Sequence, residues 1–293
     1  MSPTMIVIFN PTAGRRRTQL LWRVLDVLVE NGVRIDLART RRRGHATDLA
    51  RAAACAGAPL VVAAGGDGTV AEVVAGLLGT PARLGIIPLG TANVLARELA
   101  LPMQPRAVAA ALAFGRTRPL WPGIAQTSDG TRLFVQMLGA GFDAQVVHRL
   151  APPLKRLLGR GAYVLQTLGE AVRYPYPPLR VRIDGVERPA ASVVVCKGRL
   201  YGGPYLLAPD ASPGAPGFTV ALFGAGCTLA TLGYSAALPL NLLPHVPGLA
   251  LLRGREIEIR ADGCVPAQAD GDAAGATPLL IRDSESSIEV VVG

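Results

Sequence analysis

The sequence is poor in the residues that commonly form disulfides and zinc centres. Its histidines are His45, His148 and His245, and its cysteines are Cys55, Cys196, Cys227 and Cys264. The histidines are scattered and no two cysteines have the C-x-x-C spacing, so the pattern argues against a zinc site. Buried, unpaired thiols in a reducing compartment are the simplest interpretation.

Aromatic residues and lysine are also scarce. Aromatic residues make up 5% of the chain, and only Lys155 and Lys197 among the 30 basic residues are lysines. The net charge of +9 favours anionic partners such as phosphate ligands, lipid head groups or nucleic acid. The arginine clusters at 15–17 and 41–43 lack the interleaved aromatic residues that a single-strand binder would use, so no nucleic-acid partner is expected.

One long stretch, residues 211–252, contains no Asp, Glu, Lys or Arg. It is long enough to span a bilayer, but five prolines interrupt it and its best helical part covers only about 227–238. A buried helix is the usual interpretation, and a helix that lines a lipid pocket or touches a membrane is the alternative. The apolar run at 5–9 has no basic segment before it, so no signal peptide is expected.

The first part of the chain alternates between strand and helix patterns. Apolar segments at 5–9, 33–40, 60–64 and 83–90 predict strands. Segments at 19–32, 45–57, 69–79, 91–101 and 105–115 have helical periodicity. This alternation predicts an α/β N-terminal domain, a parallel sheet with helices on both faces.

From about residue 120 the pattern changes to short strands bounded by Gly, Pro or Asp. They lie at 132–141, 179–185, 191–198, 218–224, 256–263, 278–283 and 287–293, with helical segments at about 155–173 and 227–238. This pattern predicts a β-rich antiparallel sandwich. The prolines of "RPLWPG" at 118–123 mark the boundary, which gives domains at 1–120 and 121–293.

The segment Gly65-Gly66-Asp67-Gly68-Thr69 follows a buried strand and opens a helix. In open α/β sheets, ligands bind beyond the carboxyl ends of strands. Glycines let the backbone approach a phosphate, and a helix N-terminus directs N–H groups at it. An aspartate fits there if it reaches Mg²⁺ on the phosphates, and an ordinary turn capped by aspartate is the alternative.

Two more polar turns follow predicted strands. "FNPTAG" at 9–14 offers Asn10, Thr12 and Gly14, and "PLGTAN" at 88–93 offers Gly90, Thr91 and Asn93. Three such turns after three strands predict one edge that binds phosphate or ribose. The P-loop pattern G-x-x-x-x-G-K-[ST] is absent, which excludes that class of nucleotide site.

Two motifs of the second domain allow more than one interpretation. "GAGFDA" at 139–144 has the spacing of a dinucleotide fingerprint, but no βαβ unit continues after it and no acidic residue follows at the usual distance. "QADGD" at 268–272 places Asp270 and Asp272 around Gly271. This motif is either a turn or a source of a carboxylate that takes a proton from a substrate hydroxyl.

Taken in order, NPTAG, GGDGT, PLGTAN, GAGFDA, YGGPYLLAP and QADGD resemble the catalytic region of the diacylglycerol kinase family. That family includes soluble bacterial diacylglycerol kinases and sphingosine- and ceramide-kinase relatives. The resemblance covers nearly the whole chain. GGDGT is shared with NAD kinases and phosphofructokinases, whose nucleotide-binding fold the first domain would share, and PLGTAN is the sharper mark of lipid kinases.

The resemblance implies an ATP- and Mg²⁺-dependent kinase that transfers the γ-phosphate to a lipid hydroxyl. Asp67 would hold Mg²⁺, Asp270 would act as the base, and Asp272 occupies the position usually held by Glu. Nucleotide contacts would map onto Asn10, Pro11, Thr12, Gly14, Thr40, Gly65, Gly66, Asp67, Gly68, Thr69, Glu72, Gly90, Thr91 and Asn93. A cytoplasmic enzyme at the anionic inner membrane surface, and a possible homodimer, would follow.

The chain departs from the family pattern at two places. Ala215, Pro216 and Val220 stand where many soluble bacterial members carry acidic residues, so their structural Mg²⁺ site is not expected here. Val94 stands where other members have Asp, which leaves diacylglycerol, a sphingoid base or ceramide as candidate substrates. The alternative functions are an NAD kinase-like enzyme with a soluble substrate, a non-catalytic nucleotide- or lipid-binding regulator, and an oxidoreductase that uses GAGFDA.

Overall fold

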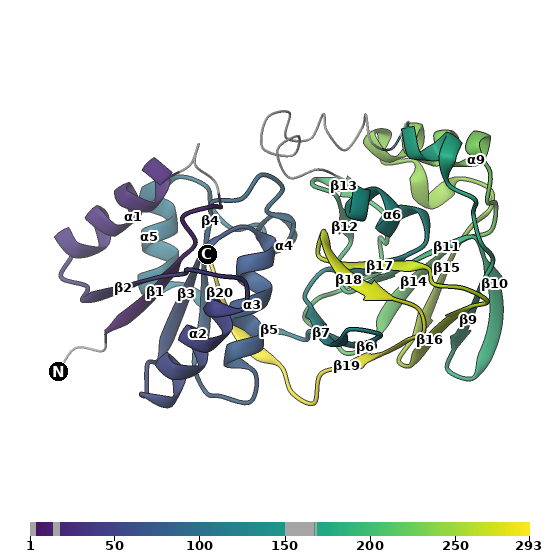
Figure 1. Ribbon diagram of the computed structural model, residues 1–293. Coiled ribbons are helices and arrows are strands. Elements are labelled where there is room, and N and C mark those ends of the chain that lie inside the picture. Colours follow the sequence, from purple (N-terminus) through teal and green to yellow (C-terminus); the bar gives the residue numbers. More distant parts are fainter. Residues whose placement is uncertain (1–3, 14–17, 150–166, 168) are drawn as a thin grey trace. The chain divides into compact units, whose positions relative to one another are not determined.

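The computed structural model describes residues 4–13, 18–149, 167 and 169–293 (Figure 1). The chain divides into unit 1, Met1–Trp121 with Glu285–Gly293, and unit 2, Pro122–Ser284. The arginines at 15–17 and most of the helix expected at 155–173 lie outside the described residues, although 169–173 is helical. The first crossing between units lies one residue from the predicted boundary, but the last residues return to unit 1.

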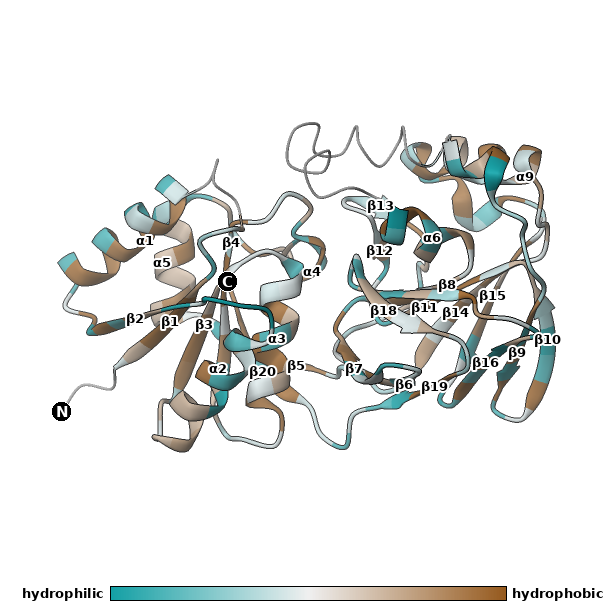
Figure 2. Cartoon of the chain, in the orientation of Figure 1, coloured by the Kyte–Doolittle hydropathy of each residue, from teal (hydrophilic) through white to brown (hydrophobic). Residues whose placement is uncertain are grey.

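Unit 1 is built on a six-stranded sheet in the order β2-β1-β3-β4-β20-β5. β1 (Met5–Phe9), β2 (Ile35–Arg39), β3 (Leu60–Gly65) and β4 (Arg83–Pro88) pair in parallel, as the alternating pattern predicts. All six residues of β3 are buried, which is the continuous apolar run expected of a strand covered on both faces (Figure 2). The predicted parallel sheet is therefore confirmed.

Helices lie on both faces of this sheet (Figure 1). They are α1 (Thr18–Glu30), α2 (His45–Cys55), α3 (Asp67–Leu77), the short α4 (Val94–Glu98) and α5 (Pro105–Phe114). On one face, α1 buries Leu21, Val24, Leu25 and Leu28 in a core shared with α5. On the other, α2 and α3 pack closely at Gly76, where a Cβ atom would come within 2.5 Å of the Thr47 carbonyl oxygen.

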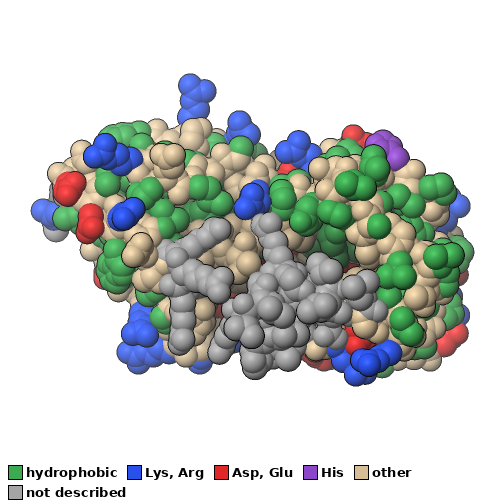
Figure 3. Space-filling model, turned by 90° about the horizontal axis from the view of Figure 1, so that it is seen from above, with side chains coloured by type: hydrophobic (Ala, Val, Ile, Leu, Met, Phe, Trp, Pro, Cys, Tyr) green, Lys and Arg blue, Asp and Glu red, His purple; other side chains and the backbone are tan. Residues whose placement is uncertain are grey.

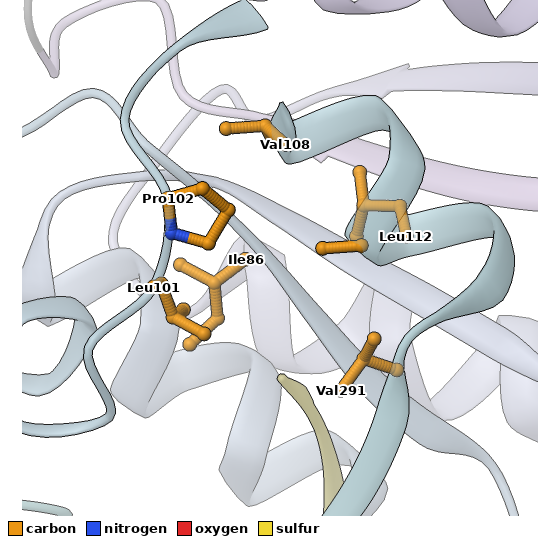
Figure 4. Close-up of a pocket in the computed structure, with 7 residues that line it drawn as sticks. Ile86, Leu101, Pro102, Val108, Leu112 and Val291 are labelled. Atoms are coloured by element: carbon orange, nitrogen blue, oxygen red, sulfur yellow. The ribbon is translucent and has the colours of Figure 1, made fainter. Parts of the chain in front are cut away.

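The C-terminal strand corrects the predicted domain organisation. Residues 287–293 were expected in the second domain, but β20 (Ile288–Val292) pairs in parallel with β4 and antiparallel with β5 (Arg116–Leu120). Its apolar residues predict a mostly buried strand, but they do not specify which sheet it joins. A small apolar cavity lies beside β20, and Val291 of that strand is part of its lining (Figure 4). The lining residues are Ile86, Leu101, Pro102, Val108, Ala111, Leu112 and Val291.

Unit 2 consists mainly of two six-stranded antiparallel sheets around one apolar core, which confirms the predicted sandwich. The first sheet contains β10 (Val186–Ala190), β9 (Leu179–Ile183), β16 (Ile257–Ala261), β19 (Leu279–Asp283), β6 (Gly123–Thr127) and β7 (Gly130–Phe134). The second contains β15 (Leu249–Gly254), β14 (Phe218–Phe223), β11 (Ser192–Cys196), β8 (Met137–Ala140), β17 (Pro266–Ala269) and β18 (Asp272–Ala276). β12 (Leu200–Tyr201) and β13 (Tyr205–Leu206) form a separate hairpin.

The uncharged segment 211–252 does not form one long helix. It contains β14, most of β15, α9 (Thr228–Ala237) and two 3₁₀ turns, Leu238–Leu240 and Leu243–His245. Within the described ranges, no helix is long and apolar enough to cross a membrane. α9 buries Thr231 and Tyr234 and exposes Leu229, so it is a surface helix with one packed face.

The prediction of buried thiols is wrong for three of the four cysteines. Cys55, Cys227 and Cys264 are exposed and unpaired, and only Cys196, on β11, is buried. The exposed cysteines lie at the end of α2, at the start of α9 and in the loop before β17. The residues that flank each cysteine in the sequence do not indicate whether the thiol is exposed or buried.

A buried lysine holds the 215–217 segment in place. Lys197 follows β11, is fully buried, and its ammonium donates to the carbonyl oxygens of Ala215 and Gly217, each at 3.0 Å. It also donates to Asp283 Oδ1 at 2.8 Å, and Asp283 Oδ2 accepts the Gly217 N–H at 2.5 Å. The residues at 215, 216 and 220 supply no carboxylate for Mg²⁺, and the carbonyl oxygens instead accept hydrogen bonds from an ammonium.

Candidate functional site

The three polar turns meet at the carboxyl edge of the unit 1 sheet. Phe9 of β1 pairs with Ala64 of β3, and Gly65 pairs with Pro88 of β4, so the three strands end side by side. Asn10 Nδ2 donates to Thr69 Oγ1 at 3.0 Å, which joins the first turn to the second. The N–H of Gly90 donates to the Gly65 carbonyl oxygen at 3.2 Å, which joins the second to the third.

The first turn is organised by Asn10. Its Oδ1 atom accepts the N–H of Thr12 at 3.0 Å and the Thr12 hydroxyl at 2.8 Å, an arrangement typical of an Asx turn. Pro11 is partly exposed and Thr12 is exposed, whereas Gly14 lies outside the described residues. Thr40 is buried at the end of β2, where its N–H donates to the Phe9 carbonyl oxygen at 2.9 Å.

Two glycines of these turns are required by close packing. A Cβ atom on Gly65 would lie 2.5 Å from Thr69 Cβ, and one on Gly90 would lie 2.6 Å from the Gly66 Cα atom. The backbones of the second and third turns are therefore in direct contact. Any side chain in place of Gly90 would push these two turns apart, because the clash is with backbone atoms.

Asp67 is the first residue of α3 and faces the start of α4. Its Oδ1 atom accepts the Leu95 N–H at 3.3 Å. Burial raises the pKa of Asp67, while backbone N–H groups, that of Leu95 first, lower it less. A cation beside this carboxylate would favour the ionised form that burial disfavours.

The donor chemistry at Asp67 fits magnesium carried by a nucleotide. Mg²⁺ commonly binds one or two protein carboxylates and takes its remaining ligands from phosphates and water. Asp67 supplies one such carboxylate at the N-terminus of α3, where free N–H groups favour phosphate. Among residues that the structure describes, no group of three or more His, Cys, Asp or Glu side chains could hold a metal.

The third turn depends on Asn93 for its shape. Asn93 is buried and has a left-handed backbone with φ 48°, and its Nδ2 donates to the carbonyl oxygens of Gly90 at 2.9 Å and Pro88 at 3.3 Å. Thr91 is exposed, and Gly68 is partly exposed on the second turn. Of the predicted contacts here, Thr91 and Gly68 are accessible to a ligand, whereas the Asn93 side chain holds the turn.

Glu72 has a structural role that sequence reasoning missed. Its Oε1 atom accepts the Gly44 N–H at 2.8 Å and its Oε2 atom accepts the Ala46 N–H at 3.2 Å. These N–H groups lie at the N-terminus of α2, whose N-cap residue Gly44 has no side chain. A helix that begins at a glycine has no side chain to cap its N–H groups. This feature of the sequence could have indicated that a side chain from another segment caps α2. The predicted nucleotide contact of Glu72 stays a prediction.

In unit 2, Asp270 and Gly271 form the two-residue turn between β17 and β18. Both have positive φ, 50° and 83°, as a type I′ hairpin turn requires. Asp270 Oδ2 accepts the Val135 N–H at 2.7 Å, and Oδ1 accepts those of Gln136 at 2.9 Å and Met137 at 3.0 Å. Both carboxylate oxygens therefore fix the turn on residues 135–137, at the start of β8.

Asp272 differs from Asp270 in its surroundings. It is the first residue of β18, and its side chain is exposed. Asp270 is partly buried and both its oxygens accept backbone N–H groups, whereas Asp272 is an exposed residue. The two acidic residues of QADGD thus differ in their surroundings: Asp270 is partly buried and Asp272 is exposed.

Comparison with known families matches both units. The model of the diacylglycerol kinase catalytic domain matches residues 4–123, and that of the YegS C-terminal NAD kinase beta sandwich-like domain matches residues 136–292. A Bacillus anthracis structure superposes with a TM-score of 0.80 at 21% identity, covering 100% of this chain and 95% of that one, which supports the two-part fold.

Proteins of similar sequence support the same family. A probable lipid kinase YegS-like protein of Chromohalobacter salexigens is 38% identical over 187 residues, covering 61% of this chain and 58% of that protein. A diacylglycerol kinase of Mycobacterium tuberculosis is 30% identical over 253 residues, covering 84% and 81%. The chain spans about three fifths of the Chromohalobacter relative's length. The predicted resemblance is confirmed, and the chain belongs to the diacylglycerol kinase catalytic-domain family, with a YegS-type C-terminal domain.

Proposed function

We propose that this protein is an ATP- and Mg²⁺-dependent lipid kinase that transfers the γ-phosphate to a hydroxyl group of a lipid. The observation that carries the proposal is the meeting of three motif turns around Asp67 at one edge of the unit 1 sheet. The names of the relatives, lipid kinase and diacylglycerol kinase, support a lipid as the acceptor.

The nucleotide phosphates would bind over Gly65–Thr69, at the N-terminus of α3. Free backbone N–H groups and the positive end of the helix dipole favour phosphate there. Asp67 would hold Mg²⁺, directly or through water. The ion would neutralise negative charge on the phosphate oxygens during transfer.

The acceptor hydroxyl would be deprotonated at the turn between β17 and β18. We assign this role to Asp272 in preference to Asp270. Asp270 accepts three backbone N–H groups, and a proton taken up there would weaken the contacts that hold the turn. Asp272 has an exposed side chain two residues away, so a proton can reach it without loss of those contacts.

A membrane would supply such an acceptor, and unit 2 carries an apolar surface suited to one. Leu229, Leu240 and Leu242, on and after α9, are 81%, 67% and 53% exposed. Apolar side chains gather on this side of unit 2 (Figure 3). We propose that these leucines enter an anionic membrane surface, helped by basic residues at roughly 1 kcal/mol for each one near the lipid.

The test is an incubation of the purified protein with γ-labelled ATP, Mg²⁺ and a total lipid extract, with a parallel reaction that contains NAD. The proposal predicts label in one class of lipid alcohol, and none with Asp67→Ala. Label in NAD would support the NAD kinase-like alternative. Binding of ATP and lipid without label in any product would support a non-catalytic regulator.

A further inference from the structure

Three motifs of unit 2 are joined by one chain of hydrogen bonds. The Tyr201 hydroxyl of YGGPY donates to Asp143 Oδ1 of GAGFDA. Gln268 Nε2 of QADGD donates to Asp143 Oδ2 at 2.7 Å. Gln268 Oε1 accepts the Gly271 N–H at 2.8 Å. The chain therefore runs from β12 through α6 (Phe142–Arg149) to the turn that precedes Asp272.

Gly139 of GAGFDA makes room for this chain of hydrogen bonds, and Gly141 is required by its own backbone conformation and packing. A Cβ atom on Gly139 would lie 2.2 Å from Asp143 Oδ2 and 3.0 Å from Gln268 Nε2. Gly141 has a φ of +102°, and a Cβ atom there would lie 3.0 Å from Ser192 Oγ. These packing requirements account for the G-x-G spacing of the motif without a dinucleotide.

The amide of Gln268 can serve both neighbours in one orientation only. Its side chain is 1% exposed, and the nitrogen must face the acceptor Asp143 while the oxygen faces the donor Gly271. Burial raises the pKa of Asp143, and the hydrogen bonds from Tyr201 and Gln268 oppose that shift. Asp143 thus sets the orientation of Gln268, which in turn holds the turn.

We propose that Asp143 and Gln268 are positioning residues that transmit the placement of Tyr201, on the β12–β13 hairpin, to the turn carrying Asp272. The role rests on the proposed function, because it acts through the assigned base. Neither residue needs to touch the reacting atoms. Without these hydrogen bonds the turn would shift, and Asp272 would lose the position that the reaction needs.

The test compares Gln268→Leu with Gln145→Leu. Gln145 lies on α6 and its amide also donates to a carboxylate, Glu170 Oε2 at 3.2 Å, but it is outside the chain to Gly271. For Gln268→Leu, kcat should fall between about tenfold and about a hundredfold while KM for ATP is unchanged. Gln145→Leu should keep the wild-type kcat, and an equal fall in both variants would overturn the proposal.

Amide hydrogen exchange at Gly271 supplies a readout that does not depend on kinase activity. Exchange should speed up by about tenfold or more in Gln268→Leu and also in Asp143→Ala, although Asp143 makes no hydrogen bond to Gly271. Unchanged exchange in Asp143→Ala would contradict the coupling. If the wild type transfers no phosphate yet the exchange results hold, the proposed function fails and the hydrogen-bond chain stands.

Two milder variants keep the test informative if Gln268→Leu or Asp143→Ala fails to fold. Tyr201→Phe removes one hydroxyl and keeps the ring, and Asp143→Asn keeps an acceptor for Gln268. Tyr201→Phe should lower kcat and speed up Gly271 exchange, and Asp143→Asn should retain more of both properties than Asp143→Ala. The same values in all variants and the wild type would overturn the positioning role.

Discussion

Asp67, Glu72 and Asp270 each accept hydrogen bonds from backbone N–H groups of another segment. For Glu72 and Asp270 these bonds involve both oxygens and fix local structure. For Asp67 burial outweighs them, and its pKa is raised. A carboxylate therefore serves as a helix cap, a turn anchor and a candidate cation ligand, depending on what surrounds it.

These roles could not be predicted from local sequence. GGDGT and QADGD indicate acidic residues at turns, and the turns were found where expected. The partners of Asp270 are residues 135–137, more than 130 positions away, and no pattern in the sequence connects them. Which carboxylate of QADGD faces solvent follows only from that long-range contact.

Replacement of Asp67 should stabilise the protein while it abolishes activity. Because the folded pKa of Asp67 is raised, ionisation costs folding free energy, and this cost grows as pH rises from about 3.8 toward the folded pKa. Asp67→Asn removes the cost, so its unfolding midpoint without nucleotide should exceed that of the wild type at pH 7. The difference should shrink as pH falls from 7 through the folded pKa toward 3.8. A difference that stays constant between pH 7 and 3.8 would argue against it.

Asp270 and Asp272 should separate in stability measurements. Asp270→Asn replaces a carboxylate that accepts three N–H groups, so it should cost about 1–3 kcal/mol of unfolding free energy. Asp272→Asn changes an exposed side chain and should stay within about 0.5 kcal/mol of the wild type. Urea unfolding of both variants checks the pair, and equal losses would contradict the assigned roles.

At the scale of elements, edge strands explain most of what sequence patterns missed. β5 contains Pro119 and β10 contains Pro189, and a proline within a run argues against a strand. Both strands lie at the edges of their sheets, where a missing N–H is tolerated. The central strands β1, β3, β4 and β11, by contrast, are apolar runs that sequence analysis identified directly.

The buried contacts of Lys197 with Asp283 and the 215–217 segment should contribute strongly to the stability of unit 2. Lys197→Met leaves Asp283 partly buried without its cation, and should cost about 3–5 kcal/mol in urea unfolding. The matched control is Arg180→Met, which breaks the exposed ion pair with Asp262 and should cost less than about 1 kcal/mol. Similar losses in both variants would show that the buried contacts of Lys197 stabilise the protein no more than an exposed ion pair does.

At the scale of the whole molecule, the chain passes from unit 1 to unit 2 and back. The return places β20 between β4 and β5, so the sheet of unit 1 is complete only when the last residues of the chain are present. Sequence analysis predicted both fold classes, but it could not predict this return, because the apolar residues of β20 predict a buried strand without specifying the sheet that it joins.

Membrane binding should depend on the exposed leucines around α9. Changing Leu229, Leu240 and Leu242 to serine removes apolar area and should weaken binding to anionic vesicles by more than about tenfold. Val186→Ser is the control, since Val186 is 54% exposed on β10 in the same unit. Vesicle sedimentation measures both, and equal binding by the triple variant and the wild type would exclude this surface.

Phosphate transfer from γ-labelled ATP to lipid vesicles, followed by extraction of the lipid phase, tests the function itself. The wild type with Mg²⁺ should transfer label into the lipid phase. Asp67→Asn and Asp272→Asn should transfer none, although Asp272→Asn should still bind ATP. Label in the lipid phase with Asp272→Asn at the wild-type rate, or none with the folded wild type over a full range of lipid alcohols, would contradict the assignment.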